Sequence, residues 1–263
     1  MVEGFAGFYE PDGTAFMATP LTRGPWDTRL QHGGPPSALL AQALADYPEG
    51  DDAFVLTRLN IDFRRGVPID RLSIAVEPIH LGRTTQRLRA SLLHEDRVVL
   101  EAQGLRVRTR TDGPDAEPPI PPWPAPDSVE PTVLDFFQHD VAYNKAVELR
   151  IVGGTWGSTP LRVWTRPRVP LVAGRSLTAI EHTVLAADAQ SGMGVPVDPL
   201  QYAFANPDLT VMLDRMPKGE WVGFDIRSTA RPHGVGLSES LIRDMQGSCG
   251  RSAQTLIVSP RAE

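Results

Sequence analysis

The sequence predicts an α+β fold built from two similar halves, each with one apolar helix and several antiparallel strands. Strand-like segments at residues 59–65 and 72–76 return 150 positions later as residues 209–215 and 222–226. A helix candidate also precedes the strands of each half. Because an apolar helix is stable only when it is buried against another element, each half is expected to pack its helix on one sheet face.

The two helix candidates differ in their signals. The first follows His32-Gly33-Gly34-Pro35-Pro36 and is rich in alanine and leucine over residues 37–45, which are strong helix formers. The second starts at about Ser176. It places Leu177, Ile180, Val184 and Ala187 on one face and ends at Ser191-Gly192.

The strand candidates alternate apolar and polar residues, as in Leu59-Asn-Ile-Asp-Phe, which is typical of half-buried strands. The last strand of each half ends alike, in Ala102-Gln103-Gly-Leu-Arg-Val and in Ala253-Gln254-Thr-Leu-Ile-Val. The spacing is 151 here, and it makes Gln103 the expected counterpart of Gln254.

A proline-rich segment separates the halves. We therefore expect an N-terminal unit at 1–112, a strap at 113–135 and a C-terminal unit at 136–263. Proline removes backbone donors, so the strap is expected to be extended along the surface rather than helical. A proline-rich ligand for a recognition domain is the alternative. Ile120 and Trp123 favour a strap that docks.

Composition excludes several classes of function. The 26 basic and 32 acidic residues give a net charge of −6, which argues against a nucleic-acid or anionic membrane partner. Cys249 is the single cysteine, so no intrachain disulfide forms. No run of 18 apolar residues and no signal peptide is present, which favours a cytoplasmic protein. The histidine spacing fits no metal motif, and neither a serine-hydrolase elbow nor a dinucleotide motif occurs, so we expect no metal and no cofactor.

Four segments occur in order along the chain: Gly24-Pro25-Trp26 with Gln31-His32-Gly33-Gly34, then Leu185-Ala-Ala-Asp188, then residues 221–229, then Ser252-Ala253-Gln254. Together with the duplication, they resemble the double-hotdog acyl-CoA thioesterases of the thioesterase II (TesB-like) type. The resemblance implies two long helices wrapped by a continuous antiparallel β-sheet, an acyl-CoA substrate, and a homodimer or higher homo-oligomer.

The resemblance also implies a catalytic trio that holds a water molecule: Asp188, the hydroxyl of Thr229 and Gln254, with Ser228 adjacent. The helical spacing puts Asp188 on the apolar face, where a carboxylate needs partners. The alternative is that it turns to solvent or caps the next turn. Gln254 shares an apolar face with Leu256, so its amide also needs a partner unless the strand faces solvent.

The first half keeps Asp46 and Gln103 but has Pro78-Ile79 where the second half has Ser228-Thr229. Ile79 cannot hold a water molecule. The chemistry is therefore expected in the second half, and Asp46 is expected to be solvated.

The His32-Gly33-Gly34 segment is the candidate substrate-binding element. Free backbone N–H groups at a helix N-terminus suit a thioester oxygen that gains negative charge. The glycines could equally serve a tight turn only. His32 could bind substrate, act as a base, or be a structural hydrogen-bonding residue.

Three functions remain open from the sequence. The leading one is hydrolysis of an acyl-CoA to a fatty acid and coenzyme A. The second is a lyase of the same fold that hydrates enoyl-CoA, which uses an Asp with a nearby His; His182 lies about 120° from Asp188 on the helical wheel and fits poorly. The third is a non-catalytic acyl-ligand-binding protein, favoured if Asp188, Thr229 and Gln254 do not converge.

Overall fold

The computed structural model describes residues 4–49, 53–116, 120–134, 137 and 139–261. The strands are β1 Tyr9–Asp12, β2 Ala15–Ala18, β3 Phe54–Phe63, β4 Arg71–Leu81, β5 Thr85–His94, β6 Arg97–Arg108, β7 Val147–Gly153, β8 Leu161–Pro167, β9 Tyr202–Ala205, β10 Asp208–Leu213, β11 Val222–Ala230, β12 Val235–Asp244 and β13 Gly247–Pro260. The helices are α1 Gly34–Ala45, α2 Tyr143–Ala146, α3 Ala179–Asp188 and α4 Gln190–Met193, with 3₁₀ turns at Pro20–Thr22 and Pro126–Ser128.

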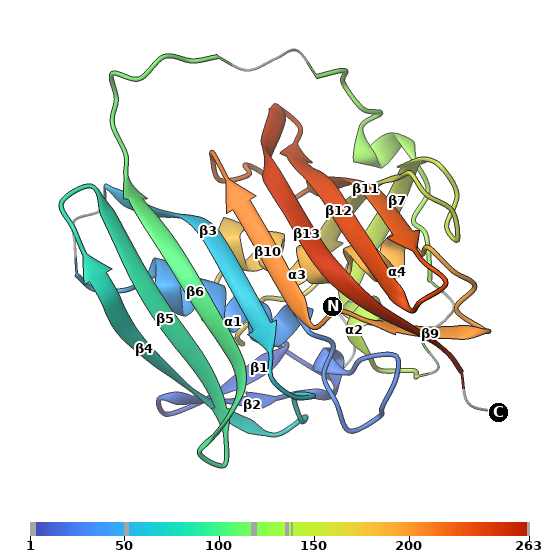
Figure 1. The fold of residues 1–263 in the computed structure, drawn as a ribbon, viewed down its shortest axis with the longest axis horizontal. Coiled ribbons are helices and arrows are strands. Elements are labelled where there is room, and N and C mark those ends of the chain that lie inside the picture. Colours follow the sequence, from blue (N-terminus) through green and yellow to red (C-terminus); the bar gives the residue numbers. More distant parts are fainter. Residues whose placement is uncertain (1–3, 50–52, 117–119, 135–136, 138, 262–263) are drawn as a thin grey trace.

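The strands of the described chain form one continuous antiparallel sheet. Its order is β1-β2-β4-β5-β6-β3-β10-β13-β12-β11-β8-β7, and β9 pairs with the end of β13. Figure 1 shows the strands side by side with α1 and α3 behind them. The predicted α+β class and the sheet that continues across both halves are therefore confirmed.

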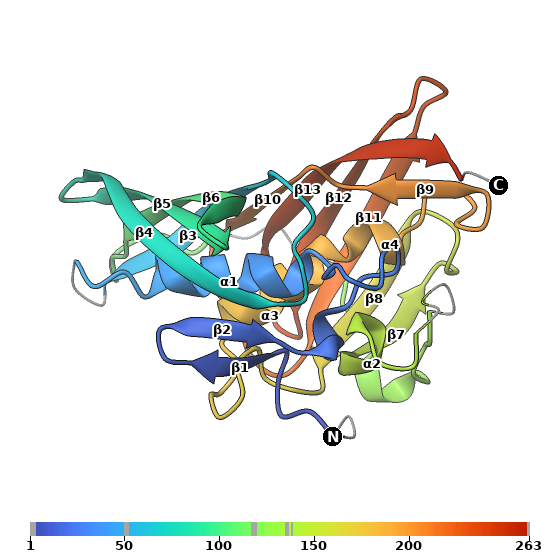
Figure 2. The same cartoon turned by 90° about the horizontal axis from the view of Figure 1, so that it is seen from below.

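Both main helices lie on the same face of the sheet. In Figure 2 the sheet lies above α1 and α3, while the β1–β2 hairpin and β7 curl round to the other side of the helices. The largest fully buried side chains include Leu40, Leu44, Leu59 and Phe224, which place the core between the helices and this face. The sheet thus wraps the helix pair, as expected.

The second helix begins later than predicted, at Ala179 instead of about Ser176. Thr178 caps it: its hydroxyl accepts from the Glu181 N–H, and the Glu181 carboxylate accepts from the Thr178 N–H. This capping box satisfies backbone donors that the first turn leaves free, and so fixes where the helix starts.

An internal twofold relates the halves. β3 and β10 pair antiparallel, and Asn60 lies opposite Thr210, its counterpart in the 150-residue repeat. A twofold axis between two strands places equivalent residues opposite each other. The sequence repeat at this position is therefore a structural repeat.

The predicted match of Gln103 with Gln254 is wrong by one residue. Asn60 pairs with Gln103, whereas its counterpart Thr210 pairs with Ala253. Gly104 is therefore the structural counterpart of Gln254. Because a one-residue shift reverses the face of a strand, Gln103 is exposed while Gln254 is buried. Asp46 is exposed as expected, and accepts a 2.7 Å hydrogen bond from Gln42.

The described part of the strap docks on the C-terminal half. Trp164 Nε1 donates to the Pro124 carbonyl at 3.0 Å, and Arg243 donates to the Pro121 carbonyl at 3.0 Å. The Arg243 guanidinium also lies 4.7 Å from the centre of the Trp123 ring. Because proline has no backbone N–H, neighbouring prolines cannot donate to these carbonyls, and the side chains of Trp164 and Arg243 donate to them instead. Within the described residues, no helix is long and apolar enough to cross a membrane.

Candidate functional site

Asp188 is the last residue of α3 and only 4% exposed. The helix face it shares with Ile180, Val184 and Ala187 is buried, so the predicted burial of the carboxylate is observed. Such a group is stable only when its oxygens are hydrogen-bonded.

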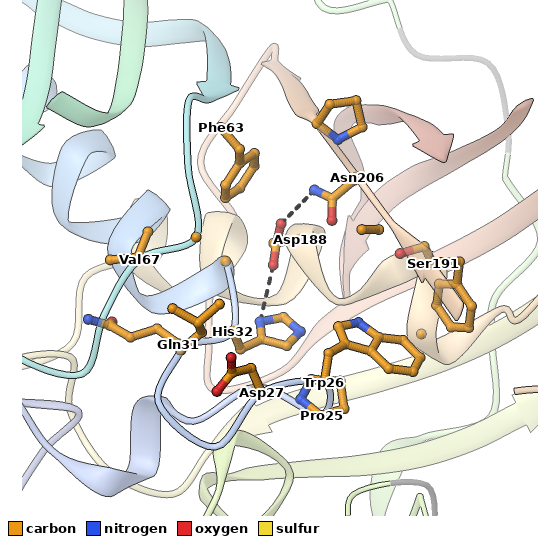
Figure 3. A pocket seen from close by; sticks show the side chains of 18 of the residues that line it. Pro25, Trp26, Asp27, Gln31, His32, Phe63, Val67, Asp188, Ser191 and Asn206 are labelled. Atoms are coloured by element: carbon orange, nitrogen blue, oxygen red, sulfur yellow. Dashed lines mark hydrogen bonds and ion pairs between the residues drawn. The ribbon is translucent and has the colours of Figure 1, made fainter. Parts of the chain in front are cut away.

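Two side chains from distant parts of the chain bind this carboxylate. Asn206 Nδ2 donates to Asp188 Oδ1 at 2.9 Å. His32 Nδ1 lies 3.1 Å from Asp188 Oδ2. Figure 3 shows the imidazole and the amide on opposite sides of the carboxylate. Each half thus supplies part of one site, since His32 precedes α1 and Asn206 lies between β9 and β10.

His32 is held rigidly. Its backbone N–H donates to the Thr22 carbonyl at 2.7 Å, and its ring stacks on Tyr143 at 4.0 Å with an interplanar angle of 7°. The Gly34 N–H approaches His32 Nδ1 at 3.0 Å. Because Nδ1 accepts this N–H, it is the unprotonated nitrogen of a neutral imidazole, and a proton that the ring takes up at Nδ1 faces Asp188 Oδ2 at 3.1 Å.

Burial perturbs both members of the pair. It raises the pKa of Asp188, against the opposing effects of His32, the Asn206 amide and the Gly34 N–H. Burial lowers the pKa of His32, against the attraction of Asp188. Two groups this close exchange their proton as a unit, and such pairs are typical of catalytic acids and bases.

Gly33, the N-cap of α1, and Gly34, its first residue, both leave too little room for a Cβ atom. A Cβ atom at Gly33 would lie 2.8 Å from Asp188 Oδ2 and 2.7 Å from the Phe63 ring, and one at Gly34 would collide with the Leu185 carbonyl. No described group accepts a hydrogen bond from the Gly33 N–H. It lies at the positive end of α1 and lines the cavity, whereas the Gly34 N–H is used by His32. Of the two predicted oxyanion donors, Gly33 is therefore the one available.

A cavity of about 400 Å³ opens at this site. Its polar wall contains Gln31, His32, Gly33, Asp188, Ser191 and Asn206. Its apolar wall contains Pro25, Trp26, Leu30, Phe63, Val67, Phe204 and Ile257. The Trp26 ring packs edge-on against Phe204 at 5.2 Å. An apolar pocket with a few converging polar groups is the usual form of a small-molecule site.

Gln254 reaches Asp188 through the main chain. It is 1% exposed, and its Nε2 donates to the Asp188 carbonyl at 2.9 Å. Its Oε1 is buried and has no partner among the described residues. Gln254 therefore holds the C-terminal end of α3 through the Asp188 carbonyl, and it does not line the cavity.

The predicted placement of Thr229 and Ser228 in the site is wrong. Thr229 is exposed on the outer face of the sheet. Ser228 points inward, but its hydroxyl donates to Ser238 Oγ at 2.9 Å and does not line the cavity. The expected trio of Asp188, Thr229 and Gln254 therefore does not converge, because successive strand residues face opposite sides and the inward one is bound to its neighbour.

Asn206 and Ser191 line the cavity and were missed by sequence reasoning. Asn206 precedes Pro207 and is indistinguishable from an ordinary turn asparagine in the sequence. Ser191 was interpreted only as a helix stop. His182 bonds Thr165 at 3.2 Å instead of Asp188, as the helical wheel indicated. Among the described residues, no group of three or more His, Cys, Asp or Glu side chains could hold a metal ion.

Comparison with known proteins places this sequence in a family. A family model for the acyl-CoA thioesterase N-terminal domain matches residues 22–107, and one for the C-terminal domain matches residues 114–258. No curated protein sequence matches the chain.

Solved structures share the fold at low identity. A hot dog fold protein from Alicyclobacillus acidocaldarius has a TM-score of 0.73 at 17% identity, covering 97% of this chain and 96% of the other. The TesB protein of Mycobacterium avium subspecies paratuberculosis has a TM-score of 0.69 at 17% identity, covering 96% of both chains. The acyl-CoA thioesterase II TesB2 of Mycobacterium marinum has a TM-score of 0.63 at 16% identity, covering 97% and 94%. The predicted double hotdog architecture is thus confirmed.

Proposed function

Because the chain belongs to the acyl-CoA thioesterase family, we propose that it hydrolyses the thioester of an acyl-CoA to a fatty acid and free coenzyme A. One observation carries the proposal. The buried His32 imidazole and Asp188 carboxylate lie 3.1 Å apart at the wall of an apolar cavity, beside the N-terminus of α1. Thioester hydrolysis requires a proton acceptor for water and a donor for the oxyanion, and this site has both.

The pair acts as the general base. Water attacks the carbonyl carbon, and its proton passes to the His32–Asp188 pair. The Gly33 N–H and the positive end of α1 stabilise the negative oxygen of the tetrahedral intermediate. When the intermediate collapses, the C–S bond breaks and the thiolate of coenzyme A takes a proton back from the pair. Water is consumed, and no metal or cofactor enters the step.

Two amide side chains hold the base in place. Asn206 binds the carboxylate directly, whereas Gln254 binds the main chain of Asp188. Of the expected catalytic trio, this proposal retains Asp188 and Gln254 and leaves out Thr229. The acyl group lies along Trp26, Phe204 and Ile257, which form the apolar wall. A homodimer or higher assembly, a cytoplasmic location and unit boundaries at 112/113 and 135/136 remain predictions.

The test is a thiol-release assay on acyl-CoAs of several chain lengths, with wild type and Asp188→Asn. We expect release by wild type on at least one chain length and a loss of about 10²-fold or more in kcat for the variant. Absence of release by wild type on every chain length would refute hydrolysis. Equal rates for the two proteins would refute the assignment of Asp188.

The His32–Asp188 pair also gives a reason to keep the lyase as a second candidate. Hydration of an enoyl-CoA needs an Asp and a His that share protons, and the structure supplies the His from the other half of the chain. Loss of enoyl absorbance without thiol release would identify the lyase, whereas thiol release from saturated acyl-CoA would identify the hydrolase.

A further inference from the structure

Ser191, on α4, has a hydroxyl that forms no hydrogen bond within the described part of the chain. The residue is 5% exposed and lines the cavity that contains Asp188. No described residue forms a hydrogen bond with its Oγ. Figure 3 shows this oxygen directed into the cavity, on the side of Asp188 and Asn206. A hydroxyl that lines a cavity and has no protein partner is open to a hydrogen bond with a molecule bound there.

The backbone around Ser191 is fixed by its neighbours. Gln190 Nε2 donates to the Ser238 carbonyl at 2.9 Å, and Gln190 Oε1 accepts from Ser240 and Ser252 at 2.8 and 2.7 Å. On the other side, Trp156 Nε1 donates to the Gly192 carbonyl at 3.1 Å. The hydroxyl is therefore held in the cavity by anchors that do not involve it.

Ser191 follows Asp188 by three residues along a nearly helical path. Ala189 between them has φ −77° and ψ −4°, and the Gly192 N–H returns to the Ala189 carbonyl at 3.0 Å. Side chains three apart on such a path lie on one side, with Cβ atoms roughly 5–6 Å apart. That separation suits one water molecule bonded to both side chains.

We propose that Ser191 Oγ positions the attacking water beside Asp188, the role that the family resemblance implied for Thr229. The inference rests on the proposed hydrolysis. One O–H of the water donates to the His32–Asp188 pair and the other to Ser191 Oγ, so that a lone pair of the water oxygen faces the thioester carbon. Ser191 forms no covalent bond, and its own proton stays on Oγ.

The test compares Ser191→Ala and Ser191→Thr with wild type in steady-state thiol release. We expect Ser191→Ala to lower kcat roughly tenfold, the effect of one lost hydrogen bond, with KM within about twofold. Ser191→Thr keeps a hydroxyl and should retain most of kcat. The pH of half-maximal activity should not move, because the His32–Asp188 pair is intact.

Ser37→Ala is the matched control, since Ser37 is a helical serine whose hydroxyl has no partner among the described residues but which is fully buried and does not line the cavity. It should keep the wild-type kcat. A Ser191→Ala variant with wild-type kcat, or with a raised KM and unchanged kcat, would overturn the water-positioning role while leaving the proposed function standing.

Intact-mass measurement after rapid quenching excludes a different role. We expect an unmodified chain. An acyl adduct on Ser191 would show a serine nucleophile and overturn the proposal. Absence of thiol release by wild type on every acyl-CoA would instead overturn the proposed function, and this inference with it.

Discussion

A methyl group added at Gly33 is the sharpest test of the geometry. In Gly33→Ala, the new Cβ would lie 2.8 Å from Asp188 Oδ2 and 2.7 Å from the Phe63 ring. Nonbonded heavy atoms pack best at about 3.5–4.0 Å, so the carboxylate, the ring or α1 must move by roughly half an ångström or more. The carboxylate cannot easily yield, because it is buried and bound to His32 and Asn206.

The expected loss follows from that displacement. A misplacement on the order of 1 Å at a reacting group costs about 10²-fold in rate, so kcat should fall by about 10- to 100-fold. Overpacking should also lower the free energy of unfolding by about 1–3 kcal/mol. The measurements are thiol release for kcat and urea unfolding for stability.

Gly113→Ala is the matched control, because a Cβ there would meet nothing within 4 Å. It should change neither kcat nor stability appreciably. If Gly33→Ala folds and keeps the wild-type kcat, the position of the Asp188 carboxylate does not govern turnover, and the site would have to be reassigned.

Three further predictions follow from the same contacts. Asn206→Ala removes a hydrogen-bond donor to the Asp188 carboxylate, so the pKa of Asp188 should rise further. The pH–rate profile should therefore move to higher pH, and kcat should fall roughly tenfold. Thr229→Val should keep kcat within about twofold in the thiol-release assay, because its side chain is exposed on the far sheet face; a tenfold loss would contradict that placement. Asp188→Asn should raise Tm near neutral pH. Burial raises the pKa of Asp188, so wild type loses stability as pH rises through the folded pKa and the carboxyl ionises. In acid the wild-type carboxyl is protonated, so the gain in Tm of the variant should shrink there. An equal gain at every pH would refute this prediction.

Much of the site's location could be read from the sequence. Helical spacing placed Asp188 on a buried face, and strand alternation placed Gln254 on another, because both periodicities are local properties of the backbone. Both expectations agree with the structure.

The partners of Asp188 could not be predicted in the same way. His32 lies in the other half of the chain from Asp188, and Asn206 lies beyond α4 and β9, so both contacts to the carboxylate form only in the folded structure. The match of Gln103 with Gln254 failed by one residue, and Thr229 lies on the exposed face of β11. In a strand that single step exchanges the buried face for the exposed one.

The sequence by itself determined the doubling of the chain, its helix and strand types and the burial of Asp188, since these depend on periodicity and on residues a few positions apart. The tertiary structure alone decided which side chains meet that carboxylate and which hydroxyl faces the cavity. Those outcomes depend on the register across β3 and β10 and on the approach of α1 to α3, which bring together atoms that no local pattern connects.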